Sequence, residues 1–300
     1  MLLTDLLEEF AFHCEARELS DKTIAGYKLQ CGYLFRYLLE TRDVTNLDQM
    51  KPICIKEFMV MMKDKGRKPA YINDLLKAFK CLFKYAFEEG YTEELITQKI
   101  KNVKQPKVLI RSFTPKEVKR MVDYYSGHDY LSIRNKVMIM TFFDTGIRLN
   151  ELITLRIDQV KEGYMLIYGK GNKERIVPKS PMLAKWLFKY YAVRERYFEY
   201  KSVPDYVFLS RNGKILTPEG ISVVLKEAGR NVDIDPSIRV SAHTCRHTFA
   251  HLQLKNGLDL YSLSRLMGHE SISITQRYLD GIRNDEVLLS AKKTGVLANL

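Results

Sequence analysis

The chain has 300 residues, of which 46% are hydrophobic and 11% are aromatic. This length is enough for one large domain or two ordinary ones, with ample buried core. The longest apolar stretch, residues 137–143, is far shorter than the ~20 residues that a membrane-spanning helix needs. The opening residues MLLTDLLEEF lack a basic segment and carry early acids, which is not the pattern of a secretory signal. Five cysteines without metal-type spacing predict reduced thiols in a cytoplasmic protein.

The positive charge of the chain is concentrated in its second part. The net charge is +12, from 48 basic and 36 acidic residues. Residues 1–105 hold 17 basic and 16 acidic side chains, whereas residues 106–300 hold 31 and 20, so the two balances are +1 and +11. A basic surface attracts phosphate polymers and makes binding salt-dependent. Charge alone equally fits a basic protein with no nucleic-acid partner.

The first hundred residues have the apolar periodicity of helices and no strand pattern. We predict helices over 2–19, 23–40, 52–63 and 70–88, joined by short connections. Four such helices make a compact bundle. We therefore predict a helical domain over residues 1–105.

One face of the fourth predicted helix is polar and basic. Asn73, Lys77, Lys80 and Lys84 recur at helical spacing, opposite a broad apolar face. A solvated helix face is often rich in lysine. Residues 51–84, however, carry nine basic and three acidic side chains, and four glutamates follow closely. We predict that this face, or the adjacent turn over 63–68, contacts DNA, because a helix fits the major groove.

A linker over 106–113 and a second domain over 114–300 follow the bundle. Thr114, Pro115 and Glu117 form the pattern of a helix N-terminus with a capping box. Helices are expected over 115–125 and 131–144, a β-hairpin over 164–168 and 175–178, and a third strand over 156–160. From residue 181 the pattern is helical again, with breaks near Pro204, Gly213 and Pro236. The predicted fold class is mainly α with a small antiparallel sheet.

Two arginines in the second domain suit a phosphodiester. Arg148 follows the break Thr145-Gly146, and Arg246 lies near the start of a predicted helix, beside His243. The planar guanidinium binds two phosphate oxygens at once and stays charged, and phosphoryl transfer depends mainly on positioning and charge stabilisation. Glu151, three residues after Arg148, can hold that arginine or a nearby base by hydrogen bonding. Alone, either arginine would be read as a surface ion-pair residue.

Three further side chains complete this chemistry. Lys173 lies at the tip of the predicted hairpin, where an ammonium can protonate a leaving oxygen. Lys170 is a second candidate for this role, and its spacing does not exclude it. His269 follows Gly268, which can end a helix over 259–267, and would touch the phosphate. Tyr278 is expected on or just after the next short helix. A phenol of pKa ~10 needs neighbouring cations or a base before it can attack phosphorus.

A zinc site is the rival interpretation of the histidines. His243, His247 and His251 are spaced four residues apart on one predicted helix, an arrangement familiar from metal sites. However, Thr244 stands where His-Glu-x-x-His hydrolases have glutamate. We therefore predict no metal, and we expect His247 and His251 to be helix residues with hydrogen-bond partners.

The motifs TGIRLNEL (145–152), HTCRHTFA (243–250) and MGH (267–269), with the hairpin lysine and Tyr278, resemble the tyrosine recombinase family. This family includes phage-type integrases, Xer recombinases and transposon resolvases. The resemblance covers about residues 110–285, and the first domain resembles the family's core-binding domain more loosely. It implies a mixed α/β catalytic domain of the tyrosine recombinase type. It also implies that Tyr278 is the nucleophile of a site-specific recombinase that cleaves and rejoins DNA through a 3′-phosphotyrosyl link.

The resemblance assigns the remaining roles as well. Arg148 and Arg246 would clamp the scissile phosphate, Lys173 would be the general acid, His243 would assist proton transfer, and His269 would hydrogen-bond the phosphate. Neither cofactor nor metal is implied. The expected partner is double-stranded DNA with paired inverted-repeat sites, bound by a homotetramer or by a tetramer with a related recombinase. No membrane partner is expected.

The sequence departs from the family pattern at two places. Cys245 replaces the usual leucine and is apolar enough to pack there, and Leu279-Asp280 replaces a small residue and histidine. Residues 284–300 are expected to pack on a neighbouring subunit, with packing on the same subunit as the alternative. Two other functions remain open: a type IB topoisomerase-like enzyme that relaxes DNA, and a non-catalytic DNA-binding accessory protein.

Overall fold

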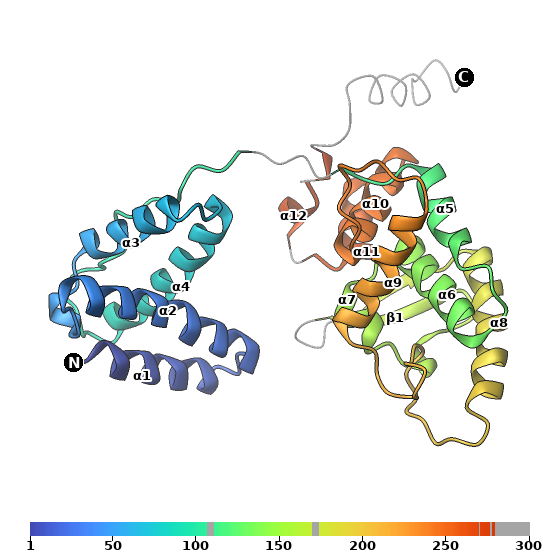
Figure 1. Ribbon diagram of the computed structural model, residues 1–300, viewed down its shortest axis with the longest axis horizontal. Coiled ribbons are helices and arrows are strands. Elements are labelled where there is room, and N and C mark those ends of the chain that lie inside the picture. Colours follow the sequence, from blue (N-terminus) through green and yellow to red (C-terminus); the bar gives the residue numbers. More distant parts are fainter. Residues whose placement is uncertain (107–110, 170–173, 270, 277, 280–300) are drawn as a thin grey trace, which may run out of the picture. The chain divides into compact units, whose positions relative to one another are not determined.

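The structure is a computed structural model that describes residues 1–106, 111–169, 174–269, 271–276 and 278–279. The chain divides into two compact units, residues 1–107 and 108–300. The described part is mainly helical, with one two-stranded antiparallel sheet (Figure 1). This matches the predicted fold class. None of the described helices is both long and apolar enough to cross a membrane.

The first unit is a bundle of four helices, as the apolar periodicity predicts. They are α1 (Leu3–Ala16), α2 (Asp21–Arg42), α3 (Pro52–Asp64) and α4 (Pro69–Glu88). Proline at the first turn starts both α3 and α4, where its missing N–H costs nothing. The apolar faces meet in one core, in which Leu34, Phe58 and Phe79 are almost completely buried.

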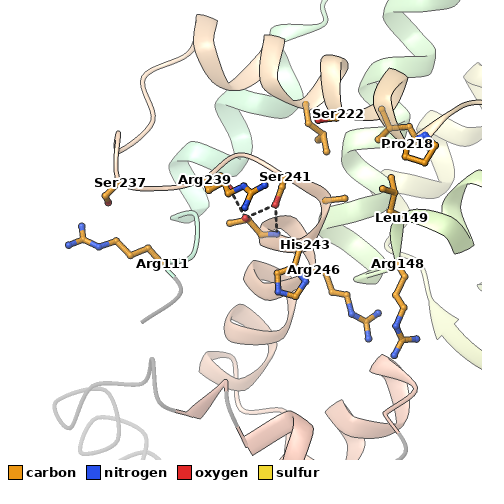
Figure 2. A pocket seen from close by; sticks show the side chains of 14 residues that line it. Arg111, Arg148, Leu149, Pro218, Ser222, Ser237, Arg239, Ser241, His243 and Arg246 are labelled. Atoms are coloured by element: carbon orange, nitrogen blue, oxygen red, sulfur yellow. Dashed lines mark hydrogen bonds between the residues drawn. The ribbon is translucent and has the colours of Figure 1, made fainter. Parts of the chain in front are cut away.

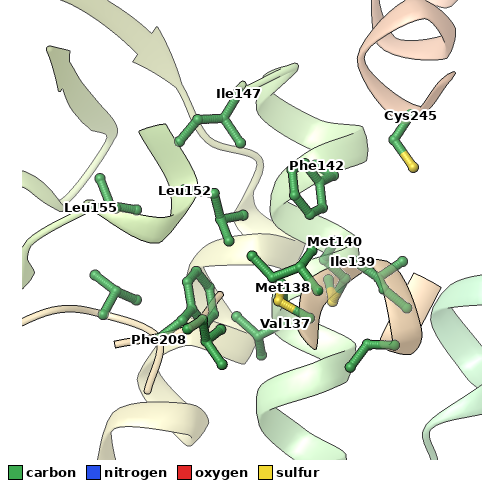
Figure 3. Packing of buried hydrophobic residues seen from close by; sticks show 14 of the residues in the cluster. Val137, Met138, Ile139, Met140, Phe142, Ile147, Leu152, Leu155, Phe208 and Cys245 are labelled. Atoms are coloured by element: carbon green, nitrogen blue, oxygen red, sulfur yellow. The ribbon is translucent and has the colours of Figure 1, made fainter. Parts of the chain in front are cut away.

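The second unit is built around helix α6 (Tyr130–Thr145), which packs against α5 (Pro115–Tyr124), α8 (Pro181–Tyr197) and α10 (Ala242–Lys255). Asp129 caps α6 through two backbone N–H groups, and Gly146 ends it in the left-handed conformation. Figure 3 shows Val137, Ile139 and Phe142 of α6 in the core of this unit. The predicted capping box of Thr114 and Glu117 is present at the start of α5.

The remaining elements carry or support the site. They are α7 (Leu149–Ile153), β1 (Tyr164–Tyr168), β2 (Glu174–Pro178), α9 (Pro218–Asn231), α11 (Leu260–Met267) and α12 (Ile272–Gln276). β1 and β2 pair with Tyr164 opposite Pro178 and Tyr168 opposite Glu174, so the hairpin is confirmed. Gly268 ends α11 with a left-handed cap, as expected. Cys245 is fully buried in the core, where the usual leucine would pack.

The expected third strand over 156–160 is wrong. Residues Ile157–Gln159 form a 3₁₀ helix, and Arg156 and Val160 make only isolated bridges. The side chain of Gln159 accepts a hydrogen bond from the backbone N–H of Arg156 at 2.7 Å. This bond closes the turn and removes a donor that a strand partner would need.

Candidate active site

Three of the predicted site residues line a single pocket of about 700 Å³ in the second unit. Arg148 comes from the start of α7, and His243 and Arg246 come from the first turn of α10 (Figure 2). The side chain of Ser241 caps α10 by accepting from the N–H of Thr244, which fixes the turn that carries His243. The fold therefore joins segments that are about a hundred residues apart in the chain.

Arg148 is held at the edge of the pocket by its own helix and by a distant loop. Its Nη1 donates to Oε1 of Glu151 at 2.9 Å, and its Nη2 donates to the carbonyl of Gly268 at 3.0 Å. The expectation that Glu151 holds Arg148 is confirmed. The guanidinium stays partly exposed, so it can still meet an anion from the pocket side.

Arg246 is buried and anchored to two backbone carbonyls. Its Nη1 donates to Gly146 and its Nη2 to Met267, each at 2.5 Å. Burial, followed by the charges of Arg148 and Arg175, lowers the pKa of Arg246 to about 10. The guanidinium is therefore still charged at neutral pH. A buried cation surrounded by other cations is stabilised when an anion binds.

Glu151 is the carboxylate that balances these cations. Arg175 of β2 donates to both of its oxygens, at 2.8 and 2.6 Å, and also to the carbonyl of Leu266 at 2.9 Å. Burial raises the pKa of Glu151, but the hydrogen bonds and charge of Arg175 and Arg148 outweigh burial and hold it at about 2. Glu151 is thus ionised at any physiological pH.

His269 connects Arg246 to the next loop. Its Nε2 lies 3.2 Å from Nη2 of Arg246, and its Nδ1 lies 2.8 Å from Oγ1 of Thr275. Because arginine can only donate, Nε2 accepts and Nδ1–H donates to Thr275. Burial, and then the neighbouring arginines, lower the pKa of His269 to about 4, which agrees with this neutral form. In this state the ring accepts a hydrogen bond from Arg246 through Nε2. The hydrogen bond from His269 to a phosphate stays a prediction.

Tyr278 follows α12 by two residues and lies against two imidazoles. Its ring is parallel to that of His269, with centroids 6.1 Å apart, and meets His247 edge-on at 4.8 Å. Only 7% of Tyr278 is exposed, and it packs with Phe249, Leu263 and Met267. The predicted position at the end of a short helix is confirmed, and the phenol lies one side chain away from Arg246.

The histidines of α10 do not face one metal. His243 is exposed at the pocket, whereas His247 is buried with its Nδ1 at 3.1 Å from Oγ of Ser112. Burial, followed by the charges of His243 and His251, lowers the pKa of His247 to about 4. No group of three or more metal-ligating side chains occurs among the described residues.

Several predicted residues lie outside this cluster. Lys173, its competitor Lys170 and the tail over 284–300 fall outside the described residues. In the first unit, Lys77 is exposed on α4, and Lys84 pairs with Glu88 at 3.0 Å. Lys80 donates to Asn102 at 3.3 Å.

Asn73 is hydrogen-bonded to the chain segment that follows the bundle. Its amide donates to the carbonyl of Val103 at 2.9 Å and accepts from the N–H of Val103 at 2.8 Å. The pair ties the chain that follows the bundle to α4. Both the nitrogen and the oxygen of the side-chain amide therefore have hydrogen-bond partners within the protein. That Asn73 contacts DNA stays a prediction.

Arg175 is a site residue that the sequence patterns did not single out. It shares one face of β2 with the fully buried Val177, because side chains in a strand alternate between two faces. An arginine on an inward strand face needs a partner, since a buried charge is costly without one. That signal could have identified it, but not its partner Glu151.

The chain is similar to known proteins in sequence. Residues 111–283 match the model of the phage integrase family. The chain is 30% identical over 280 residues to tyrosine recombinase XerD of Listeria monocytogenes, covering 92% of this chain and 94% of that protein. It is 31% identical over 284 residues to tyrosine recombinase XerA of Pyrococcus furiosus, covering 92% and 90%.

Solved structures share the fold. A lambda integrase dimer bound to a core site matches with a TM-score of 0.72 and 18% identity, covering 95% of this chain and 97% of the other. XerH site-specific recombinase bound to a palindromic difH substrate matches with a TM-score of 0.71 and 20% identity, covering 97% and 84%. With the family match over more than half of the chain, this protein belongs to the tyrosine recombinase family.

Proposed function

We propose that this chain is a site-specific DNA recombinase that cleaves and rejoins strands through a covalent link to Tyr278. The observation that carries the proposal is the continuous contact from the pocket to the phenol. Arg246 lines the pocket, its guanidinium meets His269, and His269 stacks on Tyr278. This contact supports a nucleophilic role for Tyr278, because it brings the phenol ring close to the cations that would hold a phosphate.

The pocket residues supply the electrostatic part of the reaction. Arg148 and Arg246 would bind the non-bridging oxygens of the scissile phosphate, where negative charge develops. Their positions are set by carbonyls of Gly268, Gly146 and Met267, so the guanidiniums do not have to be ordered during the reaction. Such preorganisation is the main way in which proteins stabilise a charged transition state.

The bond changes involve Tyr278 and two proton carriers. The phenol oxygen attacks phosphorus and gives its proton to His243, while the bond from phosphorus to the 5′ oxygen breaks. Lys173 donates a proton to that leaving oxygen, which departs as a hydroxyl. The product is a 3′-phosphotyrosyl link, and attack by a 5′ hydroxyl reverses the step. No metal or cofactor takes part in this scheme.

The proposed partner is double-stranded DNA with paired inverted-repeat sites. The excess charge of the second unit supports DNA binding, and XerH was solved on a palindromic site and lambda integrase as a dimer on a core site. We propose that this chain acts as a tetramer on two sites, alone or with a related recombinase, with residues 284–300 packed on a neighbouring subunit. The five unpaired cysteines support a cytoplasmic location.

Covalent capture on genomic DNA from the source tests the proposal. Protein-linked 3′ ends are isolated under denaturing conditions and sequenced, for the native chain and for Tyr278→Phe. We expect native ends that cluster at an inverted repeat and disappear in the variant. Dispersed Tyr278-dependent ends would favour a topoisomerase-like enzyme. Absence of covalent ends despite DNA binding would favour an accessory protein.

A further inference from the structure

The pocket is lined by more cationic side chains than the proposed reaction uses. Its volume of about 700 Å³ lies in the range of ~300–1,000 Å³ typical of sites for whole drug-sized ligands. The groups assigned to the scissile phosphate, Arg148, His243 and Arg246, occupy one side of it (Figure 2). Arg239 lines the pocket next to Ser241, and Arg111 lies on the side away from Arg148. The reaction scheme gives neither of these arginines a role.

The lining is one-sided in charge. Four arginines and one histidine line the pocket, and no aspartate or glutamate is among its lining residues. Two guanidiniums satisfy one phosphate, because each can bind two oxygens. Arg239 therefore leaves an excess of positive charge in a concave site, where the walls strengthen its field. Arg111 adds to this excess when it leaves its exposed ion pair with Asp235. An anion beyond the scissile phosphate would neutralise this excess.

Arg239 is placed by its backbone and leaves its guanidinium available. Its carbonyl accepts a hydrogen bond from Oγ1 of Thr244, which belongs to the same helical turn as His243 and Arg246. The backbone of Arg239 is thus tied to the helical turn that carries Arg246. Its side chain is exposed, and among the described residues no ion pair or hydrogen bond engages its guanidinium.

Arg111 has a partner that an anion can replace. Its Nη1 lies 3.1 Å from Oδ2 of Asp235, and both side chains are well exposed. Exposed ion pairs of this kind are weak, because water competes for both charges. Asp235 is itself held by Ser237, through the N–H at 2.8 Å and the hydroxyl at 2.6 Å, so it keeps hydrogen bonds if Arg111 turns to another anion.

We propose that Arg239 and Arg111 form a second phosphate site, which binds a phosphate neighbouring the scissile one on the cleaved strand. The proposal rests on the proposed function, since it takes the scissile phosphate to lie between Arg148 and Arg246. Successive phosphates of one strand follow each other by ~3.4 Å along the duplex axis, so a strand in this pocket brings a second phosphate with it. Gripping two phosphates fixes the direction of the strand as well as its position.

Binding to chemically neutralised DNA tests this inference. The probe is a duplex carrying the captured cleavage site or, if no cleavage is found, a duplex selected from a random pool. Single methylphosphonates replace each phosphate of the duplex in turn. Affinities are measured in the Tyr278→Phe background, where no strand is cut, for the parent and for added Arg239→Ala, Arg111→Ala or Arg211→Ala. Arg211 is an exposed arginine of the same unit that does not line the pocket, and serves as the matched control.

We expect Arg239→Ala to weaken binding about tenfold, the usual value of a hydrogen bond to a charged group, and Arg211→Ala to change little. One methylphosphonate beside the scissile position should weaken the parent but not the Arg239→Ala protein. Equal losses in both proteins at every position would overturn the proposal, as would identical affinities of Arg239→Ala and Arg211→Ala. Arg239→Gln, with folding checked by thermal melting, excludes a loss of structure as the cause.

The two proposals fail separately. If covalent DNA ends form at Tyr278 but no single methylphosphonate weakens binding selectively, only the second phosphate site is wrong. A selective loss in a protein that never forms covalent ends would sink the proposed reaction and leave the phosphate site standing.

Discussion

The guanidinium of Arg175 and the carboxylate of Glu151 form a two-pronged ion pair with N–O distances of 2.8 and 2.6 Å, and their side chains are only 8% and 7% exposed. The same carboxylate holds Arg148, and Arg175 also holds the carbonyl of Leu266. Arg175 is therefore a positioning residue. It connects β2 to α7 through Glu151 and to the end of α11 through Leu266, and Glu151 in turn holds Arg148 at the pocket.

Removal of Arg175 should destabilise the second unit strongly. Arg175→Ala leaves Glu151 buried with one partner fewer, and breaking a buried pair costs about 3–5 kcal/mol. Arg175→Lys keeps the charge and loses the fork. For that variant we expect slower cleavage at saturating DNA with nearly unchanged DNA affinity, because Arg148 is misplaced rather than lost.

The measurements are urea unfolding and single-turnover cleavage. Trp186, the only tryptophan of the chain, lies in the second unit and reports its unfolding by fluorescence. Arg156→Ala is the control, since the guanidinium of Arg156 makes exposed ion pairs and a contact with the ring of Tyr206, none of them buried like the Arg175–Glu151 pair. An Arg175→Lys protein with native cleavage rates would show that Arg175 has no positioning role.

Gly146→Ala should be much more damaging than Gly257→Ala. Both glycines have positive φ, +59° and +97°, so alanine strains the backbone at either place. A Cβ at Gly146 would also run into the ring of the buried Phe249, whereas nothing lies within 4 Å at Gly257. Overpacking costs about 1–3 kcal/mol. We expect a difference of that size in the unfolding free energy, read from Trp186 fluorescence; equal losses would contradict it.

Thr275→Val should slow cleavage more than Thr275→Ser. Thr275 is completely buried and accepts the Nδ1 hydrogen of His269, so valine leaves that donor without its partner. A buried donor without a partner costs about 1–3 kcal/mol. Serine keeps the hydroxyl. Because about 1.4 kcal/mol corresponds to a factor of ten, we expect the Thr275→Val protein to cleave DNA about tenfold more slowly. The rate is measured as single-turnover formation of the phosphotyrosyl product. Equal rates in the two variants would show that the hydroxyl does not orient His269.

Acidification between pH 6.5 and 4 should destabilise the second unit through its histidines. The folded pKa values of His247 and His269 are lowered to about 4, so in this window the unfolded chain binds protons that the folded chain does not. The free energy of unfolding therefore falls as the pH is lowered. Each of the two histidines contributes up to about 1 kcal/mol per pH unit, and screening by solvent reduces this contribution. His247→Gln and His269→Gln should each flatten the slope in urea unfolding, with His128→Gln as the surface control. If both variants kept the pH dependence of the parent protein, the lowered pKa values of His247 and His269 would be wrong.

On the first unit, Asn73→Ala and Lys77→Ala should have different effects. Loss of the Asn73 amide frees Val103, so we expect faster proteolysis around residues 101–106 and little change in the salt dependence of DNA binding. Lys77→Ala should lower the salt slope by about 1 if this lysine contacts a phosphate. If only Asn73→Ala lowered the salt slope of DNA binding, then Asn73 rather than Lys77 would be the residue that contacts DNA.

Local sequence determined most elements of this protein. Apolar spacing set the helices of the bundle, Thr114 and Glu117 closed the start of α5, and Gly268 ended α11, because each depends on neighbours a few residues away. The same locality misled at 156–160, where a strand-like run closes into a turn through Gln159. The motifs also predicted which side chains carry the chemistry.

Only the tertiary structure decided how those side chains are held and charged. Arg246 contacts carbonyls of Gly146 and Met267, and Arg175 finds Glu151 across 24 positions of chain. The neutral state of His269 follows from burial among these cations. Electrostatic interactions depend on distance and burial in space. The sequence names the charged groups, and the fold sets which of them meet.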